Sequence, residues 1–442
     1  MRRSAWRFLW ISEEIRNRLL FSLGILVIYR LAAHIPVPGV DRAAIAQVLA
    51  GAGSGQTLFS LLDLLSGGTV STFSVLAMGV YPYITAQIIL QILVPIIPAL
   101  QRRMEEDPRE GRKWMERWTY YLAVPMAALQ AFSQIQLFRQ FASGGILLQP
   151  LGWNLPTVTM ILSMTAGTMF AIWLGELISE HGLRNQGLSL IIFAGIVARI
   201  PANLQRILLD EQNRIPLLIF ILALMAASIF VIVIVQEGRR HVPVMYPGRR
   251  VGNRMSMPVK GTLPLMVNMA GMIPLIFAQS ILTLPAIVAQ FFIQSETAWL
   301  QSIALWLQNT FGGISPSYWL LYFLMVVAFT FFYTDVLFSQ QNYGENLKRS
   351  GAQIPGVTKG APTQKYLTKV LRRITLPGAL FLGTVAVMPF LVTLIWPSVG
   401  KNAGLLVTSA GLLIVVGVVR DVYRSIEAEL KLRGYDAAVL VH

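Results

Sequence analysis

Long apolar runs recur along the whole 442-residue chain, and they limit what it can fold into. Ten of them are candidates to cross a bilayer, because roughly 20 helical residues at about 1.5 Å each match a hydrocarbon core of about 30 Å. They cover residues 19–35, 74–98, 118–138, 156–178, 188–204, 215–236, 263–292, 318–339, 374–396 and 405–422. With 55% hydrophobic and 13% charged residues, the chain is predicted to be an all-α polytopic membrane protein with ten transmembrane helices.

One further apolar segment is too short to span. Residues 57–66 provide only half the required length and are followed by Gly67 and Gly68. Such a segment must be buried in protein or line a water-filled cavity, because lipid cannot satisfy its backbone groups. The pattern alone is equally consistent with a packed re-entrant or interfacial helix and with a plug.

Basic residues are concentrated on alternate loops. Of the 36 lysines and arginines, 29 lie in the N-terminal segment, the C-terminal tail and the loops that follow even-numbered spans. Loops rich in these residues face the cytoplasm, so both termini are predicted to be cytoplasmic. Two of these loops, at about 237–262 and 340–373, are long and nearly free of acids. They suit acidic partners such as anionic lipid or RNA phosphates.

The usual signatures of catalysis are missing from the sequence. It has no cysteine, no HExxH, no Walker-type lysine loop and no nucleophile elbow. The middle of the predicted spans lacks the charged residues that ion-coupled transporters use. We therefore predict no enzyme activity, no metal site and no cofactor. Uncharged polar residues could form weak contacts between helices, worth about 1 kcal/mol each. These are Thr85, Gln87, Gln91, Gln130, Asn268, Gln279 and Ser280.

Several long blocks of the sequence match one family. They include LLSGGTVSTFSVLAMGVYPYITAQIILQIL (64–93), LPLMVNMAGMIPLIFAQSIL (263–282) and NLKRSGAQIPG (346–356). In these blocks the chain resembles the SecY family of bacterial protein-translocation channels. The resemblance implies two inverted five-helix halves, residues 1–210 and 211–442, around a central hourglass pore with a short plug helix at about 57–67. It also implies a protein-conducting channel that passes unfolded secretory polypeptides across the cytoplasmic membrane and releases signal or transmembrane segments sideways into lipid.

The resemblance also implies roles for individual residues. A pore ring of aliphatic side chains, which would exclude ions by dewetting, comprises Val80, Ile84, Leu188, Ile192, Ile276 and Ile414. The plug residues are Leu58, Phe59, Leu61, Leu62, Leu65, Gly67 and Gly68. The polar residues of a lateral gate are Thr85, Gln91, Gln130, Asn268 and Gln279. The contact loops for partners carry Arg239, Arg240, Arg249, Arg250, Lys348, Arg349 and Lys359.

The partners that the resemblance implies are SecE and SecG, the motor ATPase SecA, the ribosome, secretory and membrane-protein substrates, membrane lipid, and the accessory proteins SecDF and YidC. Two loops depart from the family pattern. GLRNQGLS (182–189) is one residue longer than the family's loop before the fifth span, and GVTKG (356–360) places Thr358 where the family has arginine. The residues themselves leave two other functions open. One is a ten-helix small-solute facilitator, and the other is a membrane enzyme acting on lipid-linked substrates.

Overall fold

A computed structural model of the chain describes residues 13–40, 73–141, 154–183, 186–198, 200–201, 214–247, 250–251, 254–255, 259–292, 297–311, 315–395 and 409–432. These residues are mostly helical, which confirms the helical prediction. They form two compact units. The first contains Met1–Leu217, Leu282–Tyr318 and Ile414–His442, and the second contains Leu218–Ile281 and Trp319–Leu413.

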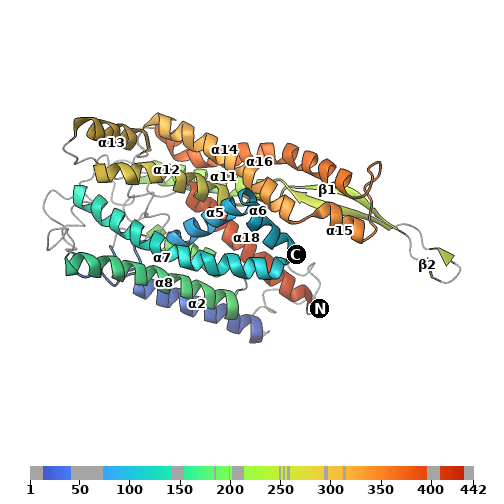
Figure 1. Cartoon of the computed structure of the whole chain (residues 1–442), viewed down its shortest axis with the longest axis horizontal. Coiled ribbons are helices and arrows are strands. Elements are labelled where there is room, and N and C mark those ends of the chain that lie inside the picture. Colours follow the sequence, from blue (N-terminus) through green and yellow to red (C-terminus); the bar gives the residue numbers. More distant parts are fainter. Residues whose placement is uncertain are drawn as a thin grey trace. The chain divides into compact units, whose positions relative to one another are not determined.

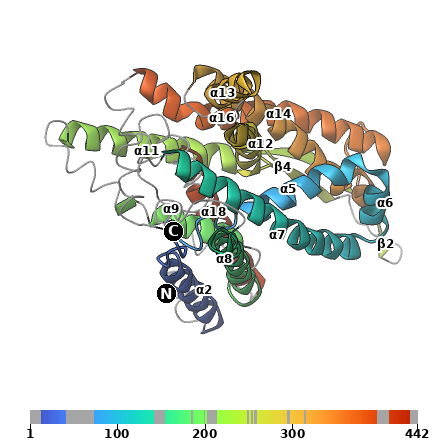
Figure 2. The same cartoon turned by 60° about the vertical axis from the view of Figure 1, so that its left-hand side comes forward.

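The first unit holds most of the N-terminal helices. They are α2 (Glu13–Ala32), α5 (Tyr81–Ile96), α6 (Pro98–Glu106), α7 (Pro108–Phe141), α8 (Leu155–His181) and α9 (Gly187–Val197), joined by α13 (Ala298–Phe311), the end of α12 (Ile273–Phe292) and most of α18 (Ser409–Leu432). Helix α7 packs against α5 and α8, and α8 also packs against α2 and α9. The packing of α2, α7 and α8 can be followed in Figures 1 and 2.

Small residues let these helices approach closely. Ala123, Ala127 and Ala131 recur every fourth residue on α7, and all three are fully buried. At the contact of α8 with α9, a Cβ atom added to Gly187 would lie 1.7 Å from the carbonyl oxygen of Gly175. Stripes of small side chains bring backbones together in membranes, where lipid tails are as apolar as any large side chain.

The segment after α2 is tied to the segment before α5. The Val37 amide donates to the carbonyl of Phe73 at 3.1 Å, and the Val75 amide donates to the carbonyl of Ile35 at 2.9 Å. Gly167 on α8 makes room for this pairing, because a Cβ there would lie 2.1 Å from the Val75 carbonyl oxygen. Residues 37 and 73 are therefore neighbours, although 35 residues separate them in the sequence. The predicted plug residues fall in that stretch, outside the described residues.

The second unit combines long helices with a β-hairpin (Figure 1). Its elements are most of α11 (Arg214–Glu237), β1 (Arg239–Tyr246), β2 (Arg250–Val251), β3 (Arg254–Met255), β4 (Val259–Met266), the start of α12, most of α14 (Pro316–Gln340), α15 (Tyr343–Arg349) and α16 (Ala361–Ile395). Strands β1 and β4 pair antiparallel, with Arg239 opposite Met266 and Tyr246 opposite Val259. The short strands β2 and β3 also pair antiparallel.

The hairpin corrects two predictions. The fold is not all-α, and the predicted span 263–292 begins too early, because its first residues belong to β4 and α12 begins at Ile273. In β4 the more buried Leu263 and Leu265 alternate with the exposed Thr262 and Pro264, which is the period of a strand. The apolar residues of this strand and the following helix were read as one continuous run.

Other predicted boundaries shift, and three helices were missed. Helix α5 begins at Tyr81 instead of residue 74, and α7 begins at Pro108 instead of residue 118. Helix α16 begins at Ala361, so it extends through part of the predicted loop 340–373. Helices α6, α13 and α15 were not predicted. In the described parts of the chain, four helices are long and apolar enough to cross a membrane: Leu155–His181, Leu218–Glu237, Pro316–Arg349 and Ala361–Leu394. The count of ten spans and the two inverted halves stay predictions.

Candidate functional site

The predicted pore residues lie near helix starts or within apolar helices. Val80 caps the start of α5, and Ile84 follows on the same face one turn later. Ile192 lies on α9, Ile276 near the start of α12 and Ile414 on α18. Val80, Ile192, Ile276 and Ile414 are all buried, and Ile84 is half-buried.

Leu188 has a packing role that its predicted position in the ring does not require. It lies four residues before Ile192, so the two share a face of α9. A Cβ added to Gly175 on α8 would lie 2.8 Å from the Leu188 Cδ2 atom. The Leu188 side chain therefore covers Gly175, and it is half-buried there. Whether it also borders a pore stays a prediction.

Two of the predicted gate residues make local hydrogen bonds. The buried Thr85 hydroxyl donates to the Tyr81 carbonyl of its own helix at 2.9 Å. The buried Asn268 closes a turn between β4 and α12: its Nδ2 donates to the Gly271 carbonyl at 3.1 Å, and its Oδ1 accepts from the Gly271 amide at 3.0 Å. Gly271 has φ of 65°, a backbone conformation that favours glycine. Asn268 thus fixes where α12 begins.

The other predicted gate residues differ in burial. Gln279 on α12 is almost fully buried, whereas Gln91 on α5 and Gln130 on α7 are half-buried. A buried amide in an apolar helix is costly unless it is hydrogen-bonded, so Gln279 marks a polar point in the interior of the protein. The contact between helices that the sequence suggested for these residues stays a prediction.

The second unit carries a module that we call the basic platform, defined as β1, β4 and residues 335–374. Its interior is a cluster of apolar side chains from all of these elements. The buried members are Val242, Val244, Leu265, Phe338, Leu347, Ala352, Ile354, Leu367 and Leu371. The hairpin, the end of α14, α15 and the start of α16 therefore share one small core, which stabilises the module as a unit.

Backbone pairing adds the 350–360 loop to the hairpin. The Met245 amide donates to the Gln353 carbonyl, the Gln353 amide donates to the Met245 carbonyl, and both distances are 2.8 Å. Further along, the Thr363 hydroxyl at the start of α16 donates to the Thr358 carbonyl at 2.7 Å. The GVTKG loop (356–360) is thus anchored by hydrogen bonds on both sides, and Lys359 is exposed on it.

The shared core predicts a measurable effect for Phe338, which is 1% exposed. Phe338→Ala is expected to destabilise the platform by about 3–5 kcal/mol, since it removes a buried ring and leaves a cavity. Trypsin should then cut faster after Lys348, Arg349 and Lys359, because the local opening that admits the protease becomes more populated. Phe338→Leu is the matched control and should be cut nearly as slowly as the parent. Equal cleavage rates for parent and Phe338→Ala would contradict the shared core.

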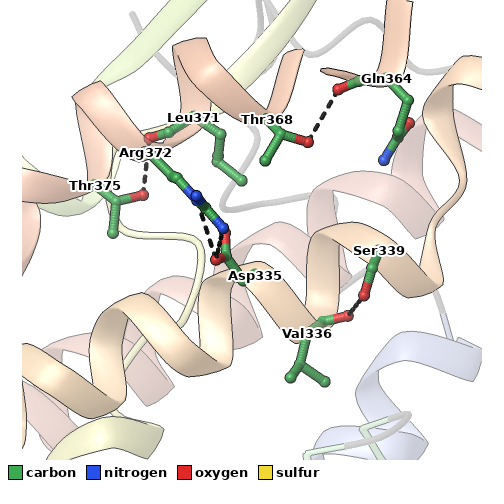
Figure 3. Close-up of polar contacts among 8 residues, drawn as sticks. All are labelled: Asp335, Val336, Ser339, Gln364, Thr368, Leu371, Arg372 and Thr375. Carbon is green, nitrogen blue, oxygen red and sulfur yellow. Dashed lines mark hydrogen bonds and ion pairs between the residues drawn. The ribbon is translucent and has the colours of Figure 1, made fainter. Parts of the chain in front are cut away.

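An ion pair joins α14 to α16 within the platform. Figure 3 shows Arg372 reaching from α16 to Asp335 on α14, where its Nε and Nη2 atoms donate to Asp335 Oδ2 at 3.1 and 2.8 Å. The nearby hydroxyls of Thr368 and Thr375 donate to carbonyls of their own helix and do not compete for the carboxylate. Two-point recognition of this kind fixes the relative rotation of two helices better than a single contact does.

Beside this ion pair lies a basic groove that the sequence analysis missed. It has a volume of about 1020 Å³, and Lys365, Lys369, Arg372 and Arg373 of α16 line it together with Glu345 of α15. These four residues recur at helical spacing, and this periodicity in the predicted loop was the available signal. The groove adds positive charge next to the predicted contact residues and gives an acidic partner a concave surface.

Five of the seven predicted contact residues lie on the platform: Arg239, Arg240, Lys348, Arg349 and Lys359. Arg240 is exposed, and Arg239 forms an ion pair of 3.3 Å with Glu237. Lys348 and Arg349 on α15 approach the Glu345 carboxylate at 4.0 and 3.6 Å. Arg250 belongs to β2, opposite Met255 of β3, and Arg249 lies outside the described residues.

Apolar helices packed through small residues, together with a basic platform built on the ends of α14 and α16, define a multi-span helical membrane protein. A family model described as SecY matches residues 74–423. The protein translocase subunit SecY of Streptomyces griseus is 38% identical over 437 residues, which cover 96% of this chain and 97% of that protein. The subunit of the same name from Streptomyces scabiei is 36% identical over 438 residues. The chain belongs to the SecY family.

Solved structures support the same fold. A structure described as that of a protein conducting channel has a TM-score of 0.60 and 19% sequence identity, and covers 95% of this chain and 92% of that chain. A SecY structure from work on the plug domain has a TM-score of 0.63 and 18% identity, and covers 96% of this chain and 94% of that chain.

Proposed function

We propose that this chain is the channel subunit of a protein translocase in the cytoplasmic membrane, with both termini in the cytoplasm. Unfolded secretory polypeptides are its substrates. The observation that carries the proposal is its relationship to protein translocase subunits, which extends over 96% of the chain. The absence of cysteine and of sequence motifs for hydrolysis or phosphate binding agrees with a channel and not an enzyme.

The proposed resting barrier has two layers. Val80, Ile84, Leu188, Ile192, Ile276 and Ile414 form an aliphatic ring, and residues 57–67 form a plug beside it. Branched aliphatic side chains repel water from a narrow pore, so ions cannot pass, yet they adapt to any polypeptide that pushes between them. The pairing of residues 35–37 with 73–75 supports the plug, because it ties together the two ends of the longer stretch that contains the plug segment.

Release into lipid is proposed to occur between α5 and α7 on one side and α12 and α14 on the other. Thr85, Gln91, Gln130, Asn268 and Gln279 are its polar residues. An apolar segment leaving sideways gains about 0.8 kcal/mol per buried CH₂ group, which is enough to draw a signal sequence out of a polar pore.

The proposed partners are SecE, SecG, substrates, and either the motor ATPase SecA or a translating ribosome as the source of energy. We place the motor and ribosome contacts on the basic platform and the hairpin tip. Arg239, Arg240 and Lys359 are supported by their exposure, and Arg250 by its place in the paired strand β2. The groove residues Lys365, Lys369 and Arg373 extend the basic surface of the platform.

The direct test is reconstitution of the full chain with SecE and SecG into liposomes. With SecA and ATP added outside, a secretory precursor should become protected from external protease, and a version without its signal sequence should not. Release of trapped small solutes without any precursor protection would instead identify a small-solute facilitator. No protection with an active motor would reject the proposal.

The ring makes a second prediction. Ile414→Asn places an amide at a position that is 4% exposed. An amide attracts water into the constriction, so the variant should conduct ions at rest and accept precursors with defective signal sequences. Ile414→Val keeps an aliphatic surface and should conduct no more than the parent. Planar-bilayer recordings in which Ile414→Asn is as tight as Ile414→Val would remove this residue from the ring.

A further inference from the structure

Helix α13 lies between α12 and α14 in the chain, and it is too short to cross the membrane. Its 14 residues span about 21 Å, well short of the hydrocarbon core. Five residues separate it from the end of α12, and four residues separate it from the start of α14. Since five extended residues reach at most about 18 Å, α13 must lie close to the membrane surface on which α12 ends and α14 begins.

The residues of α13 divide into three faces. One face is turned toward protein: Ala304 is 2% exposed, and Leu300, Leu307 and Phe311 on the same stripe are half-buried. The next face carries Trp299, Ile303, Trp306 and Thr310. The third face is polar at Gln301, Ser302, Gln308 and Asn309, although it also carries Leu305. No residue of α13 is charged.

The second face is apolar, although protein does not cover it. Trp299 is 64% exposed, Ile303 is 48% exposed and Trp306 is 62% exposed. These residues recur at i, i+4 and i+7, so they form one continuous strip beside the protein-facing stripe. In water, such a strip would expose two indole rings and an aliphatic side chain at once, which costs free energy in proportion to their area.

Lipid is the occupant that fits this strip. Tryptophan concentrates at the membrane–water boundary, where its ring lies among acyl chains and its N–H reaches the headgroups. A helix with a protein-facing, an apolar and a polar face can lie in the plane of the membrane with all three satisfied. The short connections to α12 and α14 keep α13 near the boundary between headgroups and acyl chains.

We propose that α13 is an in-plane membrane anchor, with Trp299, Ile303 and Trp306 inserted at the boundary of headgroups and acyl chains. The anchor sets the depth of the connection between α12 and α14. This role is independent of what passes through the protein.

The absence of cysteine allows a clean test by spin labelling. Trp299→Cys, Ile303→Cys and Trp306→Cys each introduce a single thiol, and Gln301→Cys is the matched control at an exposed position of the polar face. The labelled full chain is reconstituted into phosphatidylcholine–phosphatidylglycerol liposomes. Oxygen, which enters lipid, and a water-soluble nickel complex then report the surroundings of each label.

We expect oxygen to relax the labels at 299, 303 and 306 more strongly than nickel does, and the ratio to invert at 301. Strong nickel relaxation at all four positions would place α13 in water and overturn the proposal. Weak relaxation by both reagents at 299, 303 and 306 would show that protein covers the strip, and would overturn it as well. Ile303→Cys retains both tryptophans, so it decides the question even where a tryptophan variant folds poorly.

Discussion

A disulfide between Thr85→Cys and Asn268→Cys is expected to stop protein export completely. These would be the only two thiols in the chain, so an intramolecular bond must link α5 to the start of α12. If the two positions flank a closed lateral gate, their Cα atoms should come within the roughly 7 Å that a disulfide requires. A covalent bond across the gate prevents its opening, and both export and membrane insertion should recover on reduction. The measurement is precursor protection in reconstituted liposomes before and after oxidation.

The hydrogen bonds of the two native residues determine the controls. Thr85→Cys exchanges a hydroxyl that bonds within α5, whereas Asn268→Cys removes both hydrogen bonds to Gly271. Each lost bond costs about 0.5–1.5 kcal/mol, so Asn268→Cys by itself is expected to loosen the start of α12. The single variants under oxidation and the reduced double variant isolate the effect of the crosslink. Full export through quantitatively oxidised channels would rule out this gate, and failure to form the bond would show that the two positions are not neighbours.

The sequence predicted the long apolar helices well, because crossing a bilayer requires an apolar helix of a defined length. Helix α14 spans Pro316–Gln340 where residues 318–339 were predicted, and α8 spans Leu155–His181 where residues 156–178 were predicted. An uncharged run of this length has few alternatives to a membrane helix, and its ends are marked by polar or proline residues.

The prediction failed where apolar residues form the core of the platform and not a membrane span. Val242, Val244 and Leu265 are buried in the platform core, yet hydropathy alone cannot distinguish them from the apolar helix that follows. Apolar and polar residues alternate along β4, but the apolar run continues without a charged residue into α12, so the strand could not be separated from the helix. The apolar residues of α13 were overlooked for the opposite reason, since the helix is too short to reach the length expected of a span.

Site residues could be proposed only by family resemblance, because their chemistry is ordinary. Ile414 and Val80 are buried aliphatics like many others in the protein. The local hydrogen bonds of Thr85 and Asn268 could not be predicted, since either side chain can also bond to a neighbouring helix. The geometry of the turn, with φ of 65° at Gly271, decides the outcome for Asn268.

Reversing the charge at the hairpin tip is expected to abolish ribosome binding. Arg250 lies in the paired β2–β3 tip, and Arg249 precedes it in the sequence. Contacts from arginine to RNA phosphate are charge-assisted, and losing two of them at about 1.5–3 kcal/mol each predicts an affinity loss of at least about 100-fold. Arg249→Glu with Arg250→Glu adds repulsion to this loss, and the remaining binding should depend less steeply on salt. Binding of empty ribosomes to liposomes at several salt concentrations measures both quantities.

Two exposed basic residues on α7 offer a control with the same change in charge. Arg112→Glu with Lys113→Glu alters the net charge equally at residues outside the proposed contact surface. If binding depends on overall charge, both double variants should lose it to the same extent, because long-range attraction counts charges and not positions. If binding depends on contact at the tip, the tip variant should lose much more than the α7 variant. Undiminished binding of the tip variant at moderate salt would remove the hairpin from the ribosome contact and leave the groove on α16 as the basic surface to test next.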